Sequence, residues 1–170
     1  MIHNRTFLIL LILCFITYLL GMVMIPLMDI DASQYASISR EMLENKSYLQ
    51  VFDLGYDYLD KPPMLFWLSA ISMKIFGVHD WAYRLPSFLF AILAVFATYR
   101  LALLFYRKEI AQLSALVLAA SQALFLITHE VRCDTRLMGW VAFSLWQMSA
   151  WYQTNRWIHF FPSIVLIACG

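Results

Sequence analysis

Charged side chains are scarce in this sequence. Only 14% of its 170 residues are Asp, Glu, Lys or Arg, whereas 62% are hydrophobic. A soluble domain of this size needs a surface that is about one quarter charged or more, and 12 basic with 11 acidic residues cannot supply it. The shortage of charge excludes an ordinary soluble domain and indicates a membrane protein.

Cysteine, glycine and proline are also few. Of the 3 cysteines, Cys14 and Cys169 lie in apolar runs and leave Cys133 alone, so neither a disulfide framework nor a zinc site is predicted. With 5 glycines and 5 prolines the chain has no low-complexity character. A net charge of +1 shows no basic footprint for nucleic acid, which is excluded as a partner.

The long apolar runs predict an all-α fold of transmembrane helices. Spans are expected at residues 7–28, 85–105, 110–128, 137–152 and 157–170. A bilayer-crossing helix needs about 20 residues, so the last run is expected to be an incomplete span and residues 1–170 the N-terminal part of a larger transmembrane domain. A cleaved signal peptide is the alternative for the first run, but its apolar part is too long and no small-residue cleavage site precedes Pro26.

Basic residues predict the orientation of these spans. If segment 64–78 does not cross the membrane, five of them fall in short cytoplasmic stretches, as the positive-inside tendency prefers: Arg5, Arg100, Arg107, Lys108 and Arg156. Segment 64–78 is short and carries Lys74, which suits an interfacial or re-entrant helix better than a span. The N-terminus is thus expected in the cytoplasm, and residues 29–84 form a long extracytoplasmic loop.

The outer loop begins with an amphipathic segment at residues 31–45, which predicts a second interfacial helix. Asp31 with Gln34 three residues later resembles a capping box, which is one explanation of this aspartate. The other is a chemical role, since a carboxylate at a helix start beside the bilayer is held firmly. The two explanations are compatible.

Two further polar segments flank the predicted interfacial helix 64–78 and the fourth span. Asp60-Lys61-Pro62-Pro63 is either a loop-to-helix junction or a rigid site at which an ammonium meets a phosphate. In the second case the neighbouring carboxylate holds a cation or orients the lysine. The charged residues of the connection 129–136 either only keep a short loop in contact with water or contribute to a functional site. In the functional interpretation it returns Asp134 and Arg132 to the first loop, where Arg84 joins them at one outer site.

Four motifs follow one another along the chain: Asp31-Ala32-Ser33-Gln34-Tyr35-Ala36 with Arg40-Glu41-Met42, Asp60-Lys61-Pro62-Pro63, Arg84-Leu85-Pro86-Ser87 and Arg132-Cys133-Asp134. Together they resemble the opening third of bacterial GT-C glycosyltransferases, in particular the lipid A aminoarabinose transferases and the related protein mannosyltransferase-like enzymes. The resemblance covers nearly the whole chain. It implies a GT-C fold in the inner membrane, a sugar donor carried on a polyprenyl phosphate, a lipid, glycan or protein acceptor, and inversion at the sugar.

The resemblance also implies residue roles. Asp31 matches the catalytic aspartate that acts as general base on the acceptor hydroxyl, and Asp134 matches the second essential acid. Lys61 matches the lysine that contacts the donor phosphate, where Arg84 and Arg132 are expected beside it. Asp60, an aspartate where glutamate is common, is the candidate ligand of a divalent metal cation; no organic cofactor is expected.

Two positions depart from the family pattern. Ala32 stands where an acid often follows the first aspartate, and Gln34 stands where a basic residue can occur. A transporter subunit and a non-catalytic membrane scaffold are the alternative functions. Transport pathways place ionisable groups inside spans and often interrupt them with Gly or Pro, whereas the predicted spans are uncharged apart from Arg100 near one end.

Overall fold

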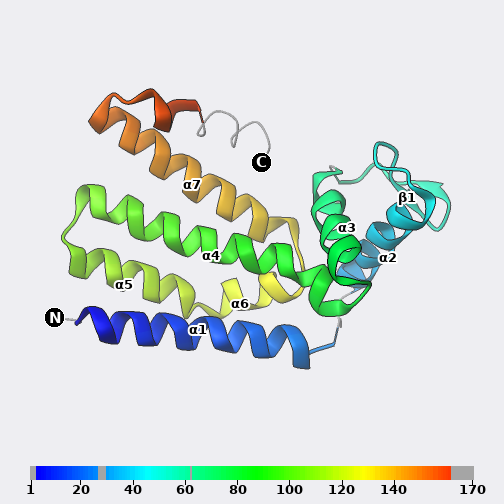
Figure 1. The fold of residues 1–170 in the computed structure, drawn as a ribbon, viewed down its shortest axis with the longest axis horizontal. Coiled ribbons are helices and arrows are strands. Elements are labelled where there is room, and N and C mark those ends of the chain that lie inside the picture. The colour runs from blue at the N-terminus through cyan, green and yellow to red at the C-terminus, as the bar shows by residue number, and fades with distance from the viewer. Residues whose placement is uncertain (1–2, 27–29, 62, 162–170) are drawn as a thin grey trace.

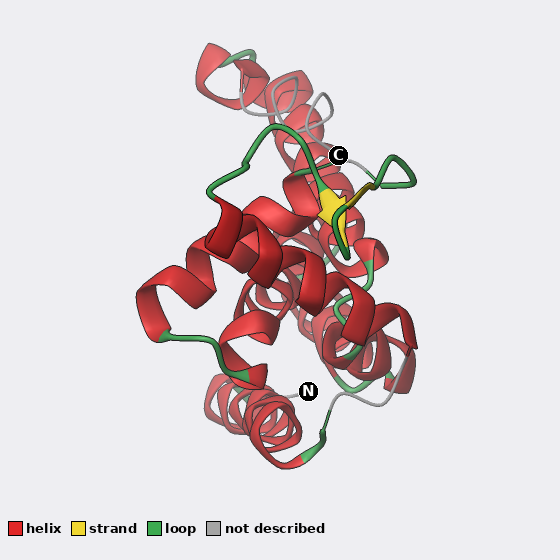
Figure 2. Ribbon diagram, turned by 90° about the vertical axis from the view of Figure 1, so that its right-hand side faces the viewer, coloured by secondary structure: helices red, strands yellow, loops and turns green. Residues whose placement is uncertain are grey.

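The computed structural model describes residues 3–26, 30–61 and 63–161. Helices make up most of the described chain (Figure 2), which confirms the predicted all-α class. The elements in chain order are α1 (Asn4–Met24), α2 (Ile30–Asn45), β1 (Phe52–Asp53), β2 (Tyr56–Asp57), α3 (Met64–Phe76), α4 (Asp80–Phe105), α5 (Lys108–Ala119), α6 (Gln122–His129) and α7 (Cys133–Thr154).

The long helices lie side by side in a bundle, and the first loop packs at one end of it (Figure 1). Helices α2 and α3 and the small hairpin occupy that end, where α4 and α7 also begin. The N-terminal end of α1, the α4–α5 connection and the C-terminal end of α7 lie at the opposite end. The bundle therefore separates the loop 30–79 from the basic connections, as the predicted orientation requires.

By length and composition, α1 and α4 are able to cross a membrane, and α5 with α6 makes a third candidate if the pair is one span. Helix α7 has 22 residues and is long enough, but its composition is more polar, and its assignment as a span stays a prediction. The expected run 157–170 lies mostly outside the described residues, which end at Phe161.

The predicted span 110–128 contains an interruption that its apolar composition does not reveal. Helix α5 ends at Ala119, α6 begins at Gln122, and the two are bent by 48°. Ser121 has an extended backbone at the N-cap position of α6, and serine favours such caps over helix interiors. The third apolar run is thus two helices joined at a break.

Helix α4 begins at Asp80, earlier than the expected residue 85, and continues through Pro86. A proline lacks the N–H that would bond to the carbonyl four residues earlier. Here that carbonyl, of Ala82, accepts a hydrogen bond of 2.6 Å from the hydroxyl of Ser72 on α3. The side chain of another helix replaces the lost backbone donor, which also fixes α3 against α4.

Two hydrophobic clusters divide the core. One joins the first loop to the starts of α4 and α7 through Ile38, Phe66, Tyr83 and Val131, all fully buried or nearly so. The other lies within the bundle, between α1, α4, α5 and α6. The predicted interfacial helices 31–45 and 64–78 correspond to α2 and α3, and their buried faces pack on each other and on the bundle end.

Helices α4 and α7 approach closely at Gly139. A Cβ atom at this position would lie 2.9 Å from the carbonyl oxygen of Phe90 and 2.9 Å from its ring. Because a real side chain does not fit at that separation, glycine permits the contact. The close approach sets the register of the two helices, which run in the same direction from the loop end of the bundle (Figure 1).

Candidate active site

Two tyrosines join α2 to the segment after the hairpin. Tyr35 is buried and Tyr58 is half-buried, and their hydroxyl groups interact with each other. Burial raises the pKa of Tyr35 to about 12 and is the largest cause that raises the pKa of Tyr58. Asp31 and Asp60 both lie within electrostatic range of the Tyr58 hydroxyl. Asp60 also lines the same groove as Tyr58, whereas Asp31 is related to this tyrosine only through its charge.

Asp31 is exposed in the first turn of α2. Gln34 does not reach back to it as in a capping box. Instead, the Gln34 amide donates to the Oδ2 atom of Asp53 at 2.5 Å. The residue that departs from the family pattern therefore serves to attach the hairpin to α2.

The hairpin is also held by Glu41 on α2. Its carboxylate accepts hydrogen bonds from the backbone N–H groups of Leu54 at 3.0 Å and Gly55 at 3.1 Å. These two turn residues have φ angles of 53° and 83°, the pattern of a type I′ turn, which fits a two-residue hairpin. Glu41 thus satisfies the turn and anchors it on the helix.

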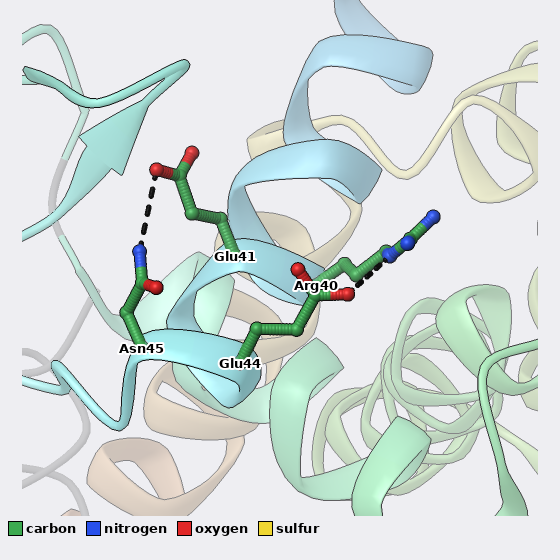
Figure 3. Close-up of polar contacts among 4 residues, drawn as sticks. All are labelled: Arg40, Glu41, Glu44 and Asn45. Atoms are coloured by element: carbon green, nitrogen blue, oxygen red, sulfur yellow. Dashed lines mark hydrogen bonds and ion pairs between the residues drawn. The ribbon is translucent and has the colours of Figure 1, made fainter.

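Figure 3 shows two pairs of polar side chains on α2, Glu41 with Asn45 and Arg40 with Glu44. Asn45 donates to Glu41 at 3.4 Å, and Arg40 pairs with Glu44 at 2.7 Å one turn along the helix. Both contacts join residues four positions apart, the spacing at which side chains meet on a helix. These side chains support α2 and the hairpin, and their partners explain them without a ligand.

Lys61 lines an open groove of about 580 Å³ between residues 49–51 and residues 57–61 and 63. Its side chain is exposed, as is that of Asp60. Next to the groove, the indole N–H of Trp67 on α3 donates to the carbonyl oxygen of Tyr48, the residue before the groove segment 49–51. The predicted phosphate-binding lysine is therefore accessible, directly beside the acid that approaches Tyr58.

The second predicted acid, Asp134, is exposed in the first turn of α7. Val131, just before this helix, is fully buried with a φ of 54°, a conformation that is strained for a β-branched residue. Cys133 lies within electrostatic range of Tyr35. The strained turn therefore brings the start of α7 to the tyrosine pair. Arg132, the predicted phosphate ligand, forms an ion pair of 2.7 Å with Glu130.

Arg84 is placed differently from the other predicted residues, because only 2% of it is exposed. Its Nε atom donates to the His129 carbonyl at 2.9 Å, and its terminal nitrogens donate to the carbonyls of Met22 at 3.2 Å, Pro26 at 3.0 Å and Ile25. A guanidinium has five N–H donors. These contacts occupy most of them and tie α4 to the ends of α1 and α6, so one donor is left for any ligand.

Among the described residues, no group of three His, Cys, Asp or Glu side chains converges to hold a metal ion. Asp60 has the carboxylate oxygens that a hard cation prefers, but its side chain is exposed. Asp31 and Asp53 act on the same tyrosine, Tyr58, through their charge, and among the described residues they do not converge with Asp60 on one point. The described residues therefore do not make a complete metal site, and no step of the chemistry is assigned to a metal.

Comparison with known proteins identifies the family to which this chain belongs. Residues 60–170 match the family model described as dolichyl-phosphate-mannose-protein mannosyltransferase. The chain belongs to this family. With the apolar helices described above, family membership makes it a multi-pass membrane protein.

Relatives of this family member include bacterial sugar transferases. The chain is 31% identical over 117 residues to the undecaprenyl phosphate-alpha-4-amino-4-deoxy-L-arabinose arabinosyl transferase of Wigglesworthia glossinidia brevipalpis, covering 68% of this chain and 21% of the relative. It is 29% identical over 163 residues to such a transferase, designated 2, of Proteus mirabilis, covering 91% of this chain and 29% of the relative. The chain thus spans about a quarter of the length of these relatives.

Solved structures support the fold of the family member. The crystal structure of ArnT from Cupriavidus metallidurans bound to undecaprenyl phosphate matches with a TM-score of 0.79 and 23% identity, over 86% of this chain and 27% of that one. The apo structure of the same protein matches with a TM-score of 0.78. At this identity the likeness shows the fold, which is the GT-C type expected from the four motifs.

The sequence analysis did not single out Arg136, a charged residue that the structure buries. Arg136 lies two positions after Asp134, yet only 5% of it is exposed. Its Nη2 atom donates to the hydroxyl of Ser69 on α3 at 3.0 Å, while Nε and Nη1 are buried without a partner in the described structure. The sequence signal was available, because an arginine in the first turn of a helix opposes the helix dipole.

Proposed function

We propose that the protein is an integral membrane glycosyltransferase that moves a sugar from a polyprenyl-phosphate donor to an acceptor on the extracytoplasmic face. The observation that carries the proposal is the open groove that Tyr58, Asp60 and Lys61 line together, with Asp31 within electrostatic range of Tyr58. Family membership and the names of the relatives, which are undecaprenyl phosphate arabinosyl transferases, support the same chemistry.

The proposed reaction is a direct displacement with inversion at the anomeric carbon. Asp31 accepts the proton of the acceptor hydroxyl, and the oxygen of that hydroxyl forms the new bond to the anomeric carbon of the sugar. The bond from the sugar to the phosphate oxygen breaks, and the polyprenyl phosphate leaves with the electron pair. Lys61 stabilises the negative charge of the leaving phosphate, which needs no proton because it is already a good leaving group.

Asp134 is proposed as the second essential acid. It lies at the start of α7, on the same bundle end as Asp31, with the neighbouring Cys133 near Tyr35. Arg132 is proposed to reach the phosphate as well, although its pairing with Glu130 must then be shared or exchanged. A divalent cation at Asp60 needs further ligands from outside the described residues.

The membrane placement belongs to the same proposal. The N-terminus, the α4–α5 connection and residue Arg156 face the cytoplasm, and residues 29–84 face outward in a cell inner membrane. The basic connections gather at one end of the bundle and the acidic loop at the other (Figure 1), which is the distribution that the positive-inside tendency favours. Acceptors proposed for this face are a lipid such as lipid A, a glycan or a protein.

The test is sugar transfer by the full-length protein in vesicles, with a radiolabelled aminoarabinose or mannose on undecaprenyl phosphate. Asp31→Asn removes the general base and is expected to lower the transfer rate by about 100-fold or more. Lys61→Ala is expected to weaken donor use, seen as a raised KM for the lipid-linked sugar.

Glu44→Gln is the matched control for Asp31→Asn. Glu44 is an exposed acid on the same helix whose partner is Arg40, and its loss is expected to leave transfer unchanged. Wild-type rates in both Asp31→Asn and Lys61→Ala, at equal protein levels in the membrane, would overturn the enzyme proposal in favour of a scaffold or a transporter subunit.

A further inference from the structure

The hairpin presents two different faces, each with one aspartate. Asp53 and Asp57 belong to neighbouring pairs of its ladder, and successive side chains of a strand point to opposite sides. Asp53 faces α2, because its Oδ2 atom accepts the hydrogen bond from Gln34. Asp57 faces the other way and lines the groove of Lys61. The second aspartate is therefore part of the proposed donor site.

Gln50, just before the hairpin, meets Asp57 in this groove. Its Nε2 atom donates a hydrogen bond of 2.7 Å to the Oδ1 atom of Asp57, and both side chains line the groove and are exposed. Their backbones are fixed as well. The Ser47 hydroxyl donates to the carbonyl oxygen of Gln50 at 2.7 Å, and the N–H of Tyr58 donates to the carbonyl oxygen of Val51 at 2.9 Å. The amide and the carboxylate are thus held in one place by local contacts.

This pair leaves both donors and acceptors free for a ligand. In the part of the chain that the structure describes, no other group bonds to the second amide N–H or the Oε1 atom of Gln50, or to the Oδ2 atom of Asp57. A hydroxyl group both donates and accepts hydrogen bonds, so neighbouring hydroxyls of a sugar ring match this edge. A phosphate oxygen only accepts, and its charge is repelled by the carboxylate. The edge therefore fits a sugar better than a phosphate.

We propose that Asp57, oriented by Gln50, binds hydroxyl groups of the donor sugar in the groove of Lys61. This inference deepens the proposed function and rests on it. The groove of about 580 Å³ lies in the range of roughly 300–1,000 Å³ that small-molecule sites occupy. Lys61 meets the phosphate of the donor, and the Gln50–Asp57 pair meets its sugar. Because a site built to bond a hydroxyl rejects an analogue that lacks it, the pair contributes to the choice of sugar.

The experiment compares two lipids with the full-length protein in vesicles. One is the undecaprenyl phosphate sugar that the wild type transfers, and the other is undecaprenyl phosphate without a sugar, measured as a competing ligand. A second series uses donors that each lack one sugar hydroxyl. The variants are Asp57→Ala, Asp57→Asn and Gln50→Ala. Asp53→Ala is the matched control, because Asp53 is an acid of the same hairpin that also accepts from a glutamine amide but is not among the residues that line the groove.

The expected result is a loss that depends on the sugar. Asp57→Ala lowers kcat/KM for the donor about 10–100-fold, since a hydrogen bond from a hydroxyl to a carboxylate is lost, and binds undecaprenyl phosphate as the wild type does. Asp57→Asn, which keeps an acceptor for Gln50, loses less. At least one deoxy donor is a poor substrate for the wild type but no worse than the full donor for Asp57→Ala, which is the coupling that two contacting groups show. Asp53→Ala keeps the wild-type preference for the sugar-bearing lipid.

Four outcomes contradict the inference and leave the pair as a contact that only holds the hairpin. They are a wild-type kcat/KM in Asp57→Ala, an equal loss of affinity for both lipids, the same loss in Asp53→Ala, and deoxy donors that lose the same factor in Asp57→Ala as in the wild type. If Asp57→Ala does not fold, the same criteria apply to Asp57→Asn and Gln50→Ala.

The proposed function is judged separately, through Asp31 and Lys61. Impaired transfer in Asp31→Asn and Lys61→Ala together with an unaffected Asp57→Ala removes only the sugar-binding role. Wild-type rates in both Asp31→Asn and Lys61→Ala remove the function, and this inference with it.

Discussion

The Nε atom of Arg84 donates a hydrogen bond of 2.9 Å to the carbonyl oxygen of His129, which joins the start of α4 to the end of α6. The two residues are 45 positions apart in the chain. With the carbonyls at the end of α1 as further partners, this arginine satisfies backbone groups that a helix end leaves without partners.

Replacement of Arg84 by Met is expected to destabilise the protein by about 3 kcal/mol, since several buried carbonyls lose a charged donor at once. The measurement is thermal unfolding in detergent, with Arg107→Met as the exposed control. If Arg84→Met melts like the wild type but binds undecaprenyl phosphate less tightly, the residue is a phosphate ligand, as its motif predicted.

Gly139→Ala is expected to be more damaging than Gly21→Ala, although both positions are crowded. The new Cβ at residue 139 meets the backbone oxygen of Phe90 at 2.9 Å, so α4 and α7 must separate. At residue 21 the three nearest atoms belong to the side chains of His129 and Phe125. Side chains shift more readily than a helix backbone, although His129 must then give up its contacts with the carbonyls of Phe125 and Tyr18. We expect a loss of about 2–3 kcal/mol for Gly139→Ala, compared by thermal unfolding. Equal melting temperatures would show that α4 and α7 do not pack as described.

Leu54→Asn is expected to stabilise the hairpin. Leu54 is 83% exposed with a φ of 53°, which costs a leucine about 1 kcal/mol and is tolerated by asparagine. An Asn-Gly turn is also the preferred sequence of type I′ hairpins. Resistance of the loop to limited proteolysis measures the gain. Leu49→Asn, at an equally exposed position without a left-handed backbone, is the control that should not improve it.

Cysteine labelling tests the orientation of the bundle. In a protein whose own cysteines are replaced by serine, Leu54→Cys in the hairpin is expected to react with a membrane-impermeant maleimide on intact spheroplasts. Tyr106→Cys in the α4–α5 connection is expected to react only after permeabilisation, because the two positions lie at opposite ends of the bundle (Figure 1). The reverse pattern would place the proposed active site in the cytoplasm and contradict an extracytoplasmic reaction.

Much of the fold follows from local patterns. Apolar runs long enough for a bilayer predict α1 and α4, and amphipathic or short apolar segments predict α2 and α3 within a few residues of their observed ends. The hairpin was not predicted, because its two-residue strands are too short for a period-2 pattern. The break at Ser121 was also missed, since an apolar run does not record where a helix bends.

The candidate site, like the fold, was predictable only in part. Asp31, Asp60, Lys61 and Asp134 stand in recognisable motifs, and the structure places their segments at one end of the bundle. The environment of each side chain was not predictable. Arg84 and Arg132 look alike as outer arginines in the sequence, yet one is enclosed by backbone carbonyls and the other is paired with Glu130.

The sequence by itself determined the class of protein, because the shortage of charge and the length of the apolar runs act through composition alone. It also determined which polar residues are available beside the membrane. Only the tertiary structure decided what those residues contact, since burial and hydrogen bonding arise between segments that are distant in the chain. Arg136 shows the difference most clearly: two positions from an exposed aspartate, the packing of α3, α4 and α7 encloses its charge and leaves one edge of it without a partner.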